Sequence, residues 1–295
     1  MAEILSGKAA ADAICGAVRD EIANLKSKGV SPTLAIVRIG ENSGDLAYER
    51  GAVKRAEKVG AEVRSYAFEE DISEADFLEK LGKICGDESI HAVLMLRPLP
   101  KHIDDAKARA VIPADKDVDG CTDVSMAGVY TGTDMGFPPC TAEAAMAMLH
   151  YYGIDPCGKR AVVIGRSLVI GKPVAMMLMG ENATVTNCHT KTEDVAALAR
   201  EADILIAAAG RLRSVGADYI KPGQIVIDVG VNWDEEKGGI AGDVDFDAAS
   251  DIAAAITPVP GGVGSVTSSI LMKHVAEAAK KTAMNKPITS AGTLL

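Results

Sequence analysis

Short apolar runs alternate with segments of helical periodicity along this 295-residue chain, and that alternation restricts the folds it can adopt. The run Thr33–Gly40 (TLAIVRIG) predicts a buried strand, and the helical pattern of Gly44–Gly60 follows it. The same order returns in the second half, where Arg160–Gly165 (RAVVIG) precedes another apolar helix. Parallel strands need crossover helices between them, so the alternation predicts an α/β fold with mostly parallel sheets.

The other predicted elements continue this rhythm. Ser73 followed by Asp76 resembles a capping box and predicts a helix over Ser73–Gly86. Further helices are predicted at Ala9–Lys26, Thr141–Tyr152, Glu193–Arg200 and Ser265–Lys281. Further strands are predicted at AEVRSYAF, HAVLML, ATVTNC, ADILIAAAG and GQIVIDVG.

One stretch departs from the pattern. Between Pro113 and Thr141 the composition shifts to Asp, Gly, Thr and Pro, which predicts a long functional loop without regular structure. A chain of this length can form two cores. We therefore predict an N-terminal domain over residues 1–140, a second domain over 141–264, and a last helix, 265–285, that packs back on the first domain.

Composition excludes some classes of protein. A net charge of -10 argues against a broad nucleic-acid surface, which needs a basic stripe. The six cysteines form no C-x-x-C pair, so reduced, buried thiols are expected. The first residues lack the basic flank and apolar core of a signal peptide, and no apolar run reaches the roughly 18 residues of a membrane span. By default the chain is placed in the cytoplasm, without a membrane partner.

The turn after Arg160–Gly165 has the order strand, glycine, glycine, helix. Gly165 and Gly171 let backbone N–H groups and a helix N-terminus face a pyrophosphate. Ser167 stands where a G-x-G-x-x-G motif has its middle glycine, and Pro173 after Lys172 excludes a P-loop. The alternative interpretation is a plain α/β turn with solvated Arg and Lys side chains.

The end of the next predicted strand discriminates between cofactors. An NAD enzyme places an acid there for the ribose hydroxyls, whereas this chain has Cys188-His189-Thr190-Lys191-Thr192. A hydroxyl and a cation at that point, with Arg166 in the turn, favour the additional phosphate of NADP.

Several collinear motifs identify a family. The chain contains VVIGRS-x-x-x-GKP, CHTKT, IVIDVGVN, GDV and ITPVPGGVG in its second half, and PADKDVDG, L-x-x-RPLP and PPCT before them. With these motifs the sequence resembles the methylenetetrahydrofolate dehydrogenase/cyclohydrolase family over nearly its whole length.

The resemblance implies a homodimer of two-domain subunits, with a folate cleft between an N-terminal α/β domain and a Rossmann-like, doubly wound parallel sheet that binds NADP. It also implies that hydride moves from 5,10-methylenetetrahydrofolate to the nicotinamide, and that the methenyl product is hydrolysed to 10-formyltetrahydrofolate. The expected partner is thus a tetrahydrofolate one-carbon substrate, and the resemblance implies no metal.

Residue roles are carried over by position. Asp119 matches an aspartate that holds the amino-pyrimidine edge of the pterin; alternatively it caps the turn before Gly120. Tyr48 matches a tyrosine along the folate rings; alternatively it is an ordinary packed aromatic. The implied catalytic residues are Tyr48, Arg97 and Asp119. Tyr48 and Asp119 also bind the substrate, together with Pro260, Gly261, Gly262 and Thr267. The implied cofactor-binding residues are Gly165, Arg166, Ser167, Gly171, Pro173, His189, Thr190, Gly210 and Val231.

The implied catalytic site departs from the family pattern. Ala52 stands where the resemblance implies a catalytic lysine, and Lys54 lies about 120° around the helix from Tyr48. Arg97 stands where the resemblance implies the glutamine that meets this lysine. One hypothesis is that the positive charge moved from position 52 to Arg97; the other is that both positions drifted after cyclohydrolase function was lost.

These departures have a chemical consequence. Arginine stays protonated, so it can orient a substrate but cannot shuttle protons. Dehydrogenase activity is therefore expected to survive better than cyclohydrolase activity. Further departures from the family pattern lie on the folate side, at Asp45, Cys121-Thr122-Asp123, Ala142 and Ser265-Val266. The identity of the substrate is therefore less certain than that of the cofactor. The alternatives are a non-catalytic NADP- or folate-binding homologue, or a dehydrogenase for another one-carbon carrier or cyclic amine.

Overall fold

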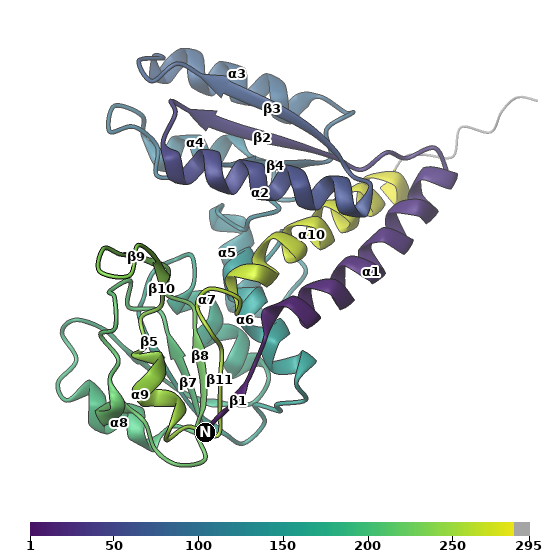
Figure 1. Cartoon of the computed structure of the whole chain (residues 1–295). Coiled ribbons are helices and arrows are strands. Elements are labelled where there is room, and N and C mark those ends of the chain that lie inside the picture. The colour runs from purple at the N-terminus through teal and green to yellow at the C-terminus, as the bar shows by residue number, and fades with distance from the viewer. Residues whose placement is uncertain (286–295) are drawn as a thin grey trace, which may run out of the picture.

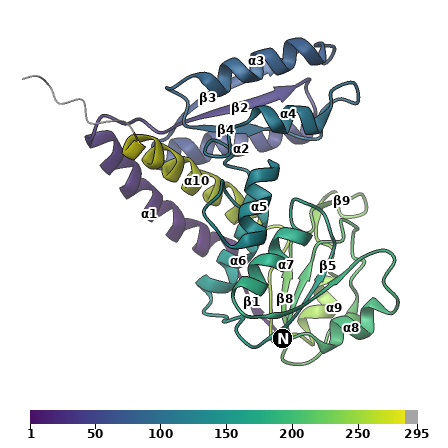
Figure 2. The ribbon, with the colours of Figure 1, turned by 180° about the vertical axis from the view of Figure 1, so that it is seen from behind.

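The computed structural model describes residues 1–285 and has two α/β lobes joined by long helices (Figure 1). Helices α1 (Gly7–Ser27) and α10 (Gly264–Asn285) lie side by side and run from the lower lobe to the upper one. Seen from behind, α5 (Asp123–Thr131) and α6 (Cys140–Tyr151) lie between the lobes (Figure 2). The junction is therefore built from helices distant in sequence.

The upper lobe holds a three-stranded parallel sheet in the order β3-β2-β4. Its strands are β2 (Thr33–Ile39), β3 (Glu62–Phe68) and β4 (Ala92–Met95), and its helices are α2 (Ser43–Val59), α3 (Glu74–Gly86) and α4 (Asp105–Val111). The predicted cap of α3 is confirmed, because Ser73 Oγ accepts the Asp76 backbone N–H at 3.1 Å. Helix α2 begins where Asn42 Oδ1 accepts the Gly44 N–H at 2.8 Å.

The lower lobe holds a six-stranded parallel sheet in the order β1-β11-β8-β7-β5-β6. The strands are β1 (Glu3–Ile4), β5 (Arg160–Ile164), β6 (Thr184–Cys188), β7 (Ile204–Ala207), β8 (Ile225–Asp228) and β11 (Ala255–Ile256). Strand order reverses at β5, since β6 lies on one side and β7 on the other, and such a reversal opens a ligand crevice at the strands' carboxyl ends. The predicted doubly wound α/β fold is confirmed.

Shorter elements complete the lower lobe. They are helices α7 (Gly171–Gly180), α8 (Val195–Glu201) and α9 (Phe246–Ser250), the 3₁₀ turn η1 (Ala217–Tyr219), and an antiparallel hairpin of β9 (Asn232–Asp234) and β10 (Gly239–Ala241). The sequence analysis predicted neither this hairpin nor α9 and β11, because each is too short to show a periodic pattern.

Strand β1 lies outside the lobe to which the sequence analysis assigned it. It pairs in parallel with β11 of the lower sheet, and the Leu5 N–H donates to the Ile256 carbonyl at 2.9 Å. Leu5 is buried in the core. The first residues therefore belong to the second sheet, although the predicted N-terminal domain begins at residue 1.

The loop expected over Pro113–Thr141 contains helix α5, so that expectation was wrong. Thr122 starts the helix, because its hydroxyl accepts the Ser125 N–H at 3.2 Å, and Gly132 ends it with φ +66. Local capping thus orders a segment whose composition is typical of turns.

The two lobes share one continuous hydrophobic cluster, which includes Leu34 of β2, Met146 of α6, Val163 of β5 and Leu271 of α10. A shared core positions the lobes against each other. No helix among residues 1–285 is both long and apolar enough to cross a membrane.

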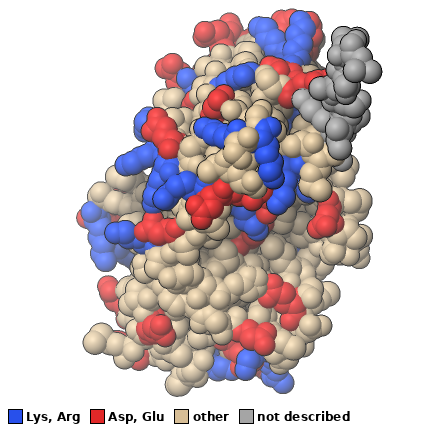
Figure 3. Space-filling view, turned by 90° about the vertical axis from the view of Figure 1, so that its right-hand side faces the viewer, with Lys and Arg blue, Asp and Glu red and all other residues tan. Residues whose placement is uncertain are grey.

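Cysteine burial matches the expectation only in part. Cys15, Cys85, Cys140 and Cys188 are buried free thiols, whereas Cys157 is exposed. On the face drawn in Figure 3, outside its grey atoms, basic and acidic side chains are interspersed over the upper lobe and form no continuous basic stripe.

Candidate active site at the junction of the lobes

The turn after β5 is closed too tightly for side chains at its two glycines. Gly165 has φ +129, and a Cβ there would lie 2.1 Å from the Ala208 carbonyl oxygen. A Cβ on Gly171 would lie 2.2 Å from the Gly165 carbonyl oxygen. Pro173 is buried in the first turn of α7. The two glycines therefore bring the start of α7 close against the end of β5, and this tight turn at a helix N-terminus is a cradle suited to a pyrophosphate.

The residues predicted to select NADP emerge at one edge of the sheet. Ile164 pairs with Cys188, so Arg166 and Thr190 each follow a neighbouring strand by two residues. Both side chains are exposed, as is Ser167, whose hydroxyl accepts the Ile170 N–H at 3.2 Å. The edge presents hydroxyls and cations without a carboxylate between positions 188 and 192, which fits a ribose phosphate.

The loop after β6 is held by its own side chains. His189 N–H donates to Thr192 Oγ1 at 2.9 Å, and His189 Nδ1 accepts the Lys191 N–H at 3.2 Å. These two hydrogen bonds order the backbone around Thr190 and so fix the position of the Thr190 side chain.

A buried aspartate that the sequence analysis did not assign organises the loops after β7 and β8. The Asp243 carboxylate accepts the N–H groups of Gly210 and Arg211, each at 2.9 Å, and the Asn232 amide at 2.9 Å. Gly210 and Val231, both predicted to contact the cofactor, are therefore positioned through Asp243, and Val231 is 64% exposed. The G-D-V motif that contains Asp243 was the available signal.

Asp228, at the end of β8, also binds the backbone of these loops. Its carboxylate accepts the N–H groups of Gly230, Asp243 and Val244 at 2.9, 3.1 and 2.9 Å. Burial raises the pKa of Asp228 to about 7, although these three bonds lower it. The sequence analysis quoted its motif, IVIDVGVN, but gave the aspartate no role.

The P-G-G segment before α10 packs against the start of α1. The Gly7 N–H donates to the Gly261 carbonyl at 2.7 Å, and a Cβ on Gly262 would lie 2.5 Å from the Pro258 carbonyl oxygen. Pro260 is exposed beside them. Thr267 is buried in the first turn of α10, where its hydroxyl donates to the Val263 carbonyl at 3.4 Å.

Two predicted site residues meet the nucleotide turn in one small cavity of about 60 Å³. Arg97 and Asp119 line it from the upper lobe, and Leu168 and Val169 line it from the turn between Gly165 and Gly171. The carboxyl ends of β4 and β5 therefore open toward the same space. Arg97 and Asp119 therefore face the turn that contains the predicted cofactor positions, whereas neither Tyr48 nor any predicted cofactor residue lines this cavity.

The carboxyl group of Asp119 has an unusual environment. Burial raises its pKa to about 6, a hydrogen bond from the Cys140 thiol opposes this rise, and Asp117 adds to it. The positive charges of His274 and Arg97 lower the pKa. At neutral pH the group is mostly ionised and can accept two N–H bonds.

Tyr48 belongs to the same environment. Burial raises the pKa of its hydroxyl well above the usual value, and the charges of Asp119 and Cys140 raise it further. The phenol therefore stays protonated and available as a hydrogen-bond donor. Its side chain packs against the shared hydrophobic cluster, as both interpretations of Tyr48 require.

The two hypotheses for positions 52 and 97, relocation of the positive charge and drift, stay predictions, and the structure shows where Arg97 points. Its Nε and Nη2 donate to the two carboxylate oxygens of Asp105 at 2.5 and 2.7 Å, which turns the guanidinium toward α4. Ala52 is buried in the hydrophobic cluster that also contains Leu96. Lys54 is exposed, as expected. Arg97 is therefore a fixed cation at the cavity that Asp119 lines.

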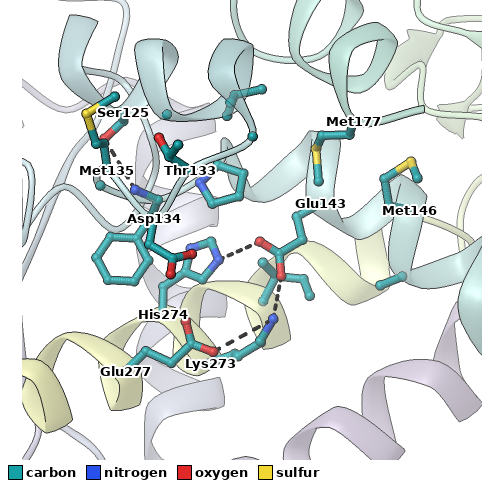
Figure 4. A pocket seen from close by; sticks show the side chains of 18 of the residues that line it. Ser125, Thr133, Asp134, Met135, Glu143, Met146, Met177, Lys273, His274 and Glu277 are labelled. Atoms are coloured by element: carbon teal, nitrogen blue, oxygen red, sulfur yellow. Dashed lines mark hydrogen bonds and ion pairs between the residues drawn. The ribbon is translucent and has the colours of Figure 1, made fainter. Parts of the chain in front are cut away.

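A second, larger cavity of about 970 Å³ contains none of the predicted site residues. It lies among α1, α5, α6, α7 and α10, and Glu143, Lys273 and His274 lie on its wall (Figure 4). Size therefore does not locate the predicted site, which lies at the smaller cavity between the nucleotide turn and Asp119.

Comparison with known proteins covers both lobes. The model described as tetrahydrofolate dehydrogenase/cyclohydrolase, catalytic domain, matches residues 5–119, and the NAD(P)-binding domain model of the same family matches residues 139–283. The bifunctional protein FolD of Carboxydothermus hydrogenoformans is 50% identical over 279 residues, which cover 94% of this chain and 97% of that relative.

Solved structures agree with this result. The bifunctional enzyme FolD, a methylenetetrahydrofolate dehydrogenase/cyclohydrolase, from Campylobacter jejuni superposes with a TM-score of 0.93 at 38% identity, covering 95% of this chain and 99% of the other. The Trypanosoma brucei methylenetetrahydrofolate dehydrogenase-cyclohydrolase, solved with NADP and an inhibitor, has a TM-score of 0.90 at 36% identity, covering 96% and 98%. The chain belongs to the tetrahydrofolate dehydrogenase/cyclohydrolase family.

Proposed function

We propose that this protein oxidises 5,10-methylenetetrahydrofolate to the 5,10-methenyl form with NADP, and that it has a weak cyclohydrolase activity toward that product. One observation carries the proposal: Asp119 and the nucleotide turn line the same cavity. A pterin held at Asp119 therefore lies at the lobe junction, next to the segment that binds the cofactor. The family match over both lobes supports this assignment.

The proposed role of the chain in the first reaction is alignment. NADP supplies the hydride acceptor when bound. The Asp119 carboxylate accepts the two N–H groups of the amino-pyrimidine edge, and Tyr48 lies along the ring system. Holding the two reacting carbons in register supplies a large part of the rate, because it removes the entropy cost of a bimolecular encounter. No titrating side chain is needed for the hydride itself.

The second reaction is different because water must be activated. Position 52 offers a methyl group in place of an amine, and Arg97 is a guanidinium held by Asp105. Arginine does not deprotonate at physiological pH, so it cannot accept a proton from water. Asp119 is the nearby group with a pKa close to neutrality, and the substrate occupies it in this proposal. We therefore propose that methenyl product accumulates before it is hydrolysed.

One assay tests both parts. Purified protein is mixed with NADP and 5,10-methylenetetrahydrofolate, and NADPH and the methenyl product are followed together. We expect both to rise in parallel, with 10-formyltetrahydrofolate appearing slowly. Immediate conversion of all methenyl product to the formyl form would refute the weak cyclohydrolase.

The same assay separates the alternatives. Tight NADP binding without NADPH formation would favour a non-catalytic homologue. Oxidation of another cyclic amine in the absence of folate binding would favour a changed substrate, for which the departures at Asp45 and Ser265-Val266 are the supporting observation.

We also propose a homodimer, which the resemblance implies, and, from composition, a location in the cytoplasm without a membrane or nucleic-acid partner. Sedimentation of the purified protein tests the assembly, and a monomer at micromolar concentration would contradict it.

A further inference from the structure

A buried ion pair lies beside the proposed substrate site, in residues with no assigned role. His274 of α10 is 1% exposed, and its Nε2 lies 2.7 Å from Glu143 Oε2 of α6. Its Nδ1 lies 2.8 Å from the carbonyl oxygen of Val118. Lys273 Nζ donates to Glu143 Oε1 at 2.7 Å, and Figure 4 shows the three side chains converging at one wall of the larger cavity.

These contacts define the protonation state of His274. A carbonyl oxygen only accepts, so Nδ1 must carry a proton. Glu143 receives the Lys273 ammonium on its other oxygen, which favours the ionised carboxylate, and an ionised carboxylate also only accepts. Nε2 must therefore donate as well, and an imidazole with two donor nitrogens is a cation.

The charge balance agrees with that geometry. Burial lowers the pKa of His274, but the charge and hydrogen bond of Glu143 and the Val118 carbonyl raise it above the ordinary value overall. The pKa of Glu143 is lowered to about 2, because His274 and Lys273 outweigh the effect of burial. The ring is also held in place by Phe137, whose centroid lies 5.0 Å from that of His274.

Two connections link this imidazolium to Asp119. The first is covalent, because the carbonyl that His274 binds belongs to Val118, the residue before Asp119. The second is Cys140, the first residue of α6, whose Sγ lies 3.7 Å from His274 Nδ1 and 3.2 Å from the Val118 carbonyl oxygen. The Cys140 thiol also lowers the pKa of the Asp119 carboxyl group.

We propose that His274, charged and held by Glu143, is a positioning residue for Asp119 that keeps its carboxylate ionised and directed into the substrate cavity. The proposal rests on the proposed function, since it takes Asp119 as the group that binds the folate.

Other groups around Asp119 do not replace His274. Asp117 and Cys121 of the same loop and Tyr48 of α2 add negative charge when ionised or remain neutral. Arg97 is also cationic and lowers the pKa of Asp119, but the Nε–Nη2 edge of its guanidinium pairs with Asp105. Glu143 contacts the Nε2 edge of His274, whereas the Nδ1 edge faces Val118 and Cys140, so the cation is nearer to Asp119 than its counter-ion is.

The sign of the pH effect follows. Asp119 must be ionised to accept two N–H bonds, so folate binding is lost as pH falls through its pKa. Removing the charge of His274 raises that pKa further. The loss of binding then begins at a higher pH in a variant than in the wild-type protein.

The test uses His274→Asn, whose amide can still donate to the Val118 carbonyl but carries no charge. The KM for 5,10-methylenetetrahydrofolate is measured from acid to alkaline pH at saturating NADP, with the Kd for NADP alongside. We expect the KM of the variant to rise about threefold near pH 6.5, because a pKa about one unit higher lowers the ionised fraction of Asp119 by that factor there, and to approach the wild-type KM at alkaline pH. The Kd for NADP should not change.

Two further variants make the result decisive. Glu143→Gln removes the counter-ion isosterically and should shift the pH profile in the same direction; it decides the question if His274→Asn does not fold. Lys280→Gln, on the same helix, removes an exposed cation that pairs with Glu21 and should leave the profile unchanged. An equal rise in KM at every pH would mean that His274 serves packing alone and would overturn the proposal, as would an unchanged KM.

A measurement without substrate separates this proposal from the proposed function. Titration of the Asp119 carboxyl carbon by NMR in the ligand-free protein should show its midpoint raised in His274→Asn. A raised midpoint in a protein that forms no NADPH would support the charge coupling and refute the dehydrogenase. An unchanged midpoint in an active dehydrogenase would refute the coupling alone.

Discussion

The nucleotide side and the folate side of the junction are built in different ways. The nucleotide turn depends on backbone, because Gly165 and Gly171 leave no room for a Cβ. The folate side depends on side chains from several elements, with Asp119 influenced by Arg97, Cys140 and His274. A backbone cradle tolerates no change at its glycines, whereas a group of charges can be rearranged in steps. This difference explains why the departures from the family pattern gather on the folate side.

The largest expected effect is at the backbone cradle. Gly171→Ala places a Cβ 2.2 Å from the Gly165 carbonyl oxygen, so the turn must open and its N–H groups move. We expect NADP affinity to fall by about a hundredfold or more, the equivalent of several lost charge-assisted bonds. Isothermal titration with NADP measures it. Gly180→Ala, at the other end of α7 with open space around it, is the matched control. Equal NADP affinity in both variants would contradict the cradle.

The next effect is expected at the Asp119 carboxylate, which we propose binds the folate. Asp119→Asn keeps the shape but removes the charge and one acceptor, so kcat/KM for the folate should fall about a hundredfold, as expected for a buried charge-assisted pair. The Kd for NADP should be retained. Asp115→Asn, at an exposed position in the same segment, is the control. An equally large loss of NADP affinity in Asp119→Asn would show that the folate side and the nucleotide side do not act independently.

A smaller effect is expected at the rim of the nucleotide side. Arg166→Gln removes an exposed cation that is predicted to contact the ribose phosphate, so NADP affinity should fall about tenfold while NAD affinity stays the same. Parallel titrations with the two cofactors measure the ratio. A uniform loss for both cofactors would mean that Arg166 contacts a part they share and does not select NADP.

The smallest effect concerns the rearranged charges. Ala52→Lys returns an amine to the family's position, and methenyl hydrolysis should rise about fivefold relative to dehydrogenation. The gain is limited because the amine must enter a cluster that contains Leu96, and the melting temperature should fall. Lys54→Ala, on the exposed face of the same helix, is the control. If the hydrolysis ratio is unchanged, the missing lysine is not what limits the cyclohydrolase.

Local features of the chain made several predictions possible. Ser73 and Asp76 identified the start of α3, and the RAVVIG run identified β5 with its turn, because caps and periodicity involve residues close in sequence. The helix in Pro113–Thr141 was missed because its composition is typical of turns, although Thr122 caps it. The direction of the Arg97 side chain could not be predicted, because it pairs with Asp105, and the sequence analysis did not predict the helix that contains Asp105.

The sequence by itself determined the alternating α/β plan, the nucleotide turn and the family, and it predicts NADP as the cofactor. Only the tertiary structure decided that β1 joins the lower sheet, that Arg97 turns to Asp105, and that His274 lies behind Asp119. The physical reason is separation along the chain: His274 and Val118 are 156 positions apart. Local propensity carries no information about such contacts, which form only when the lobes pack around a shared core.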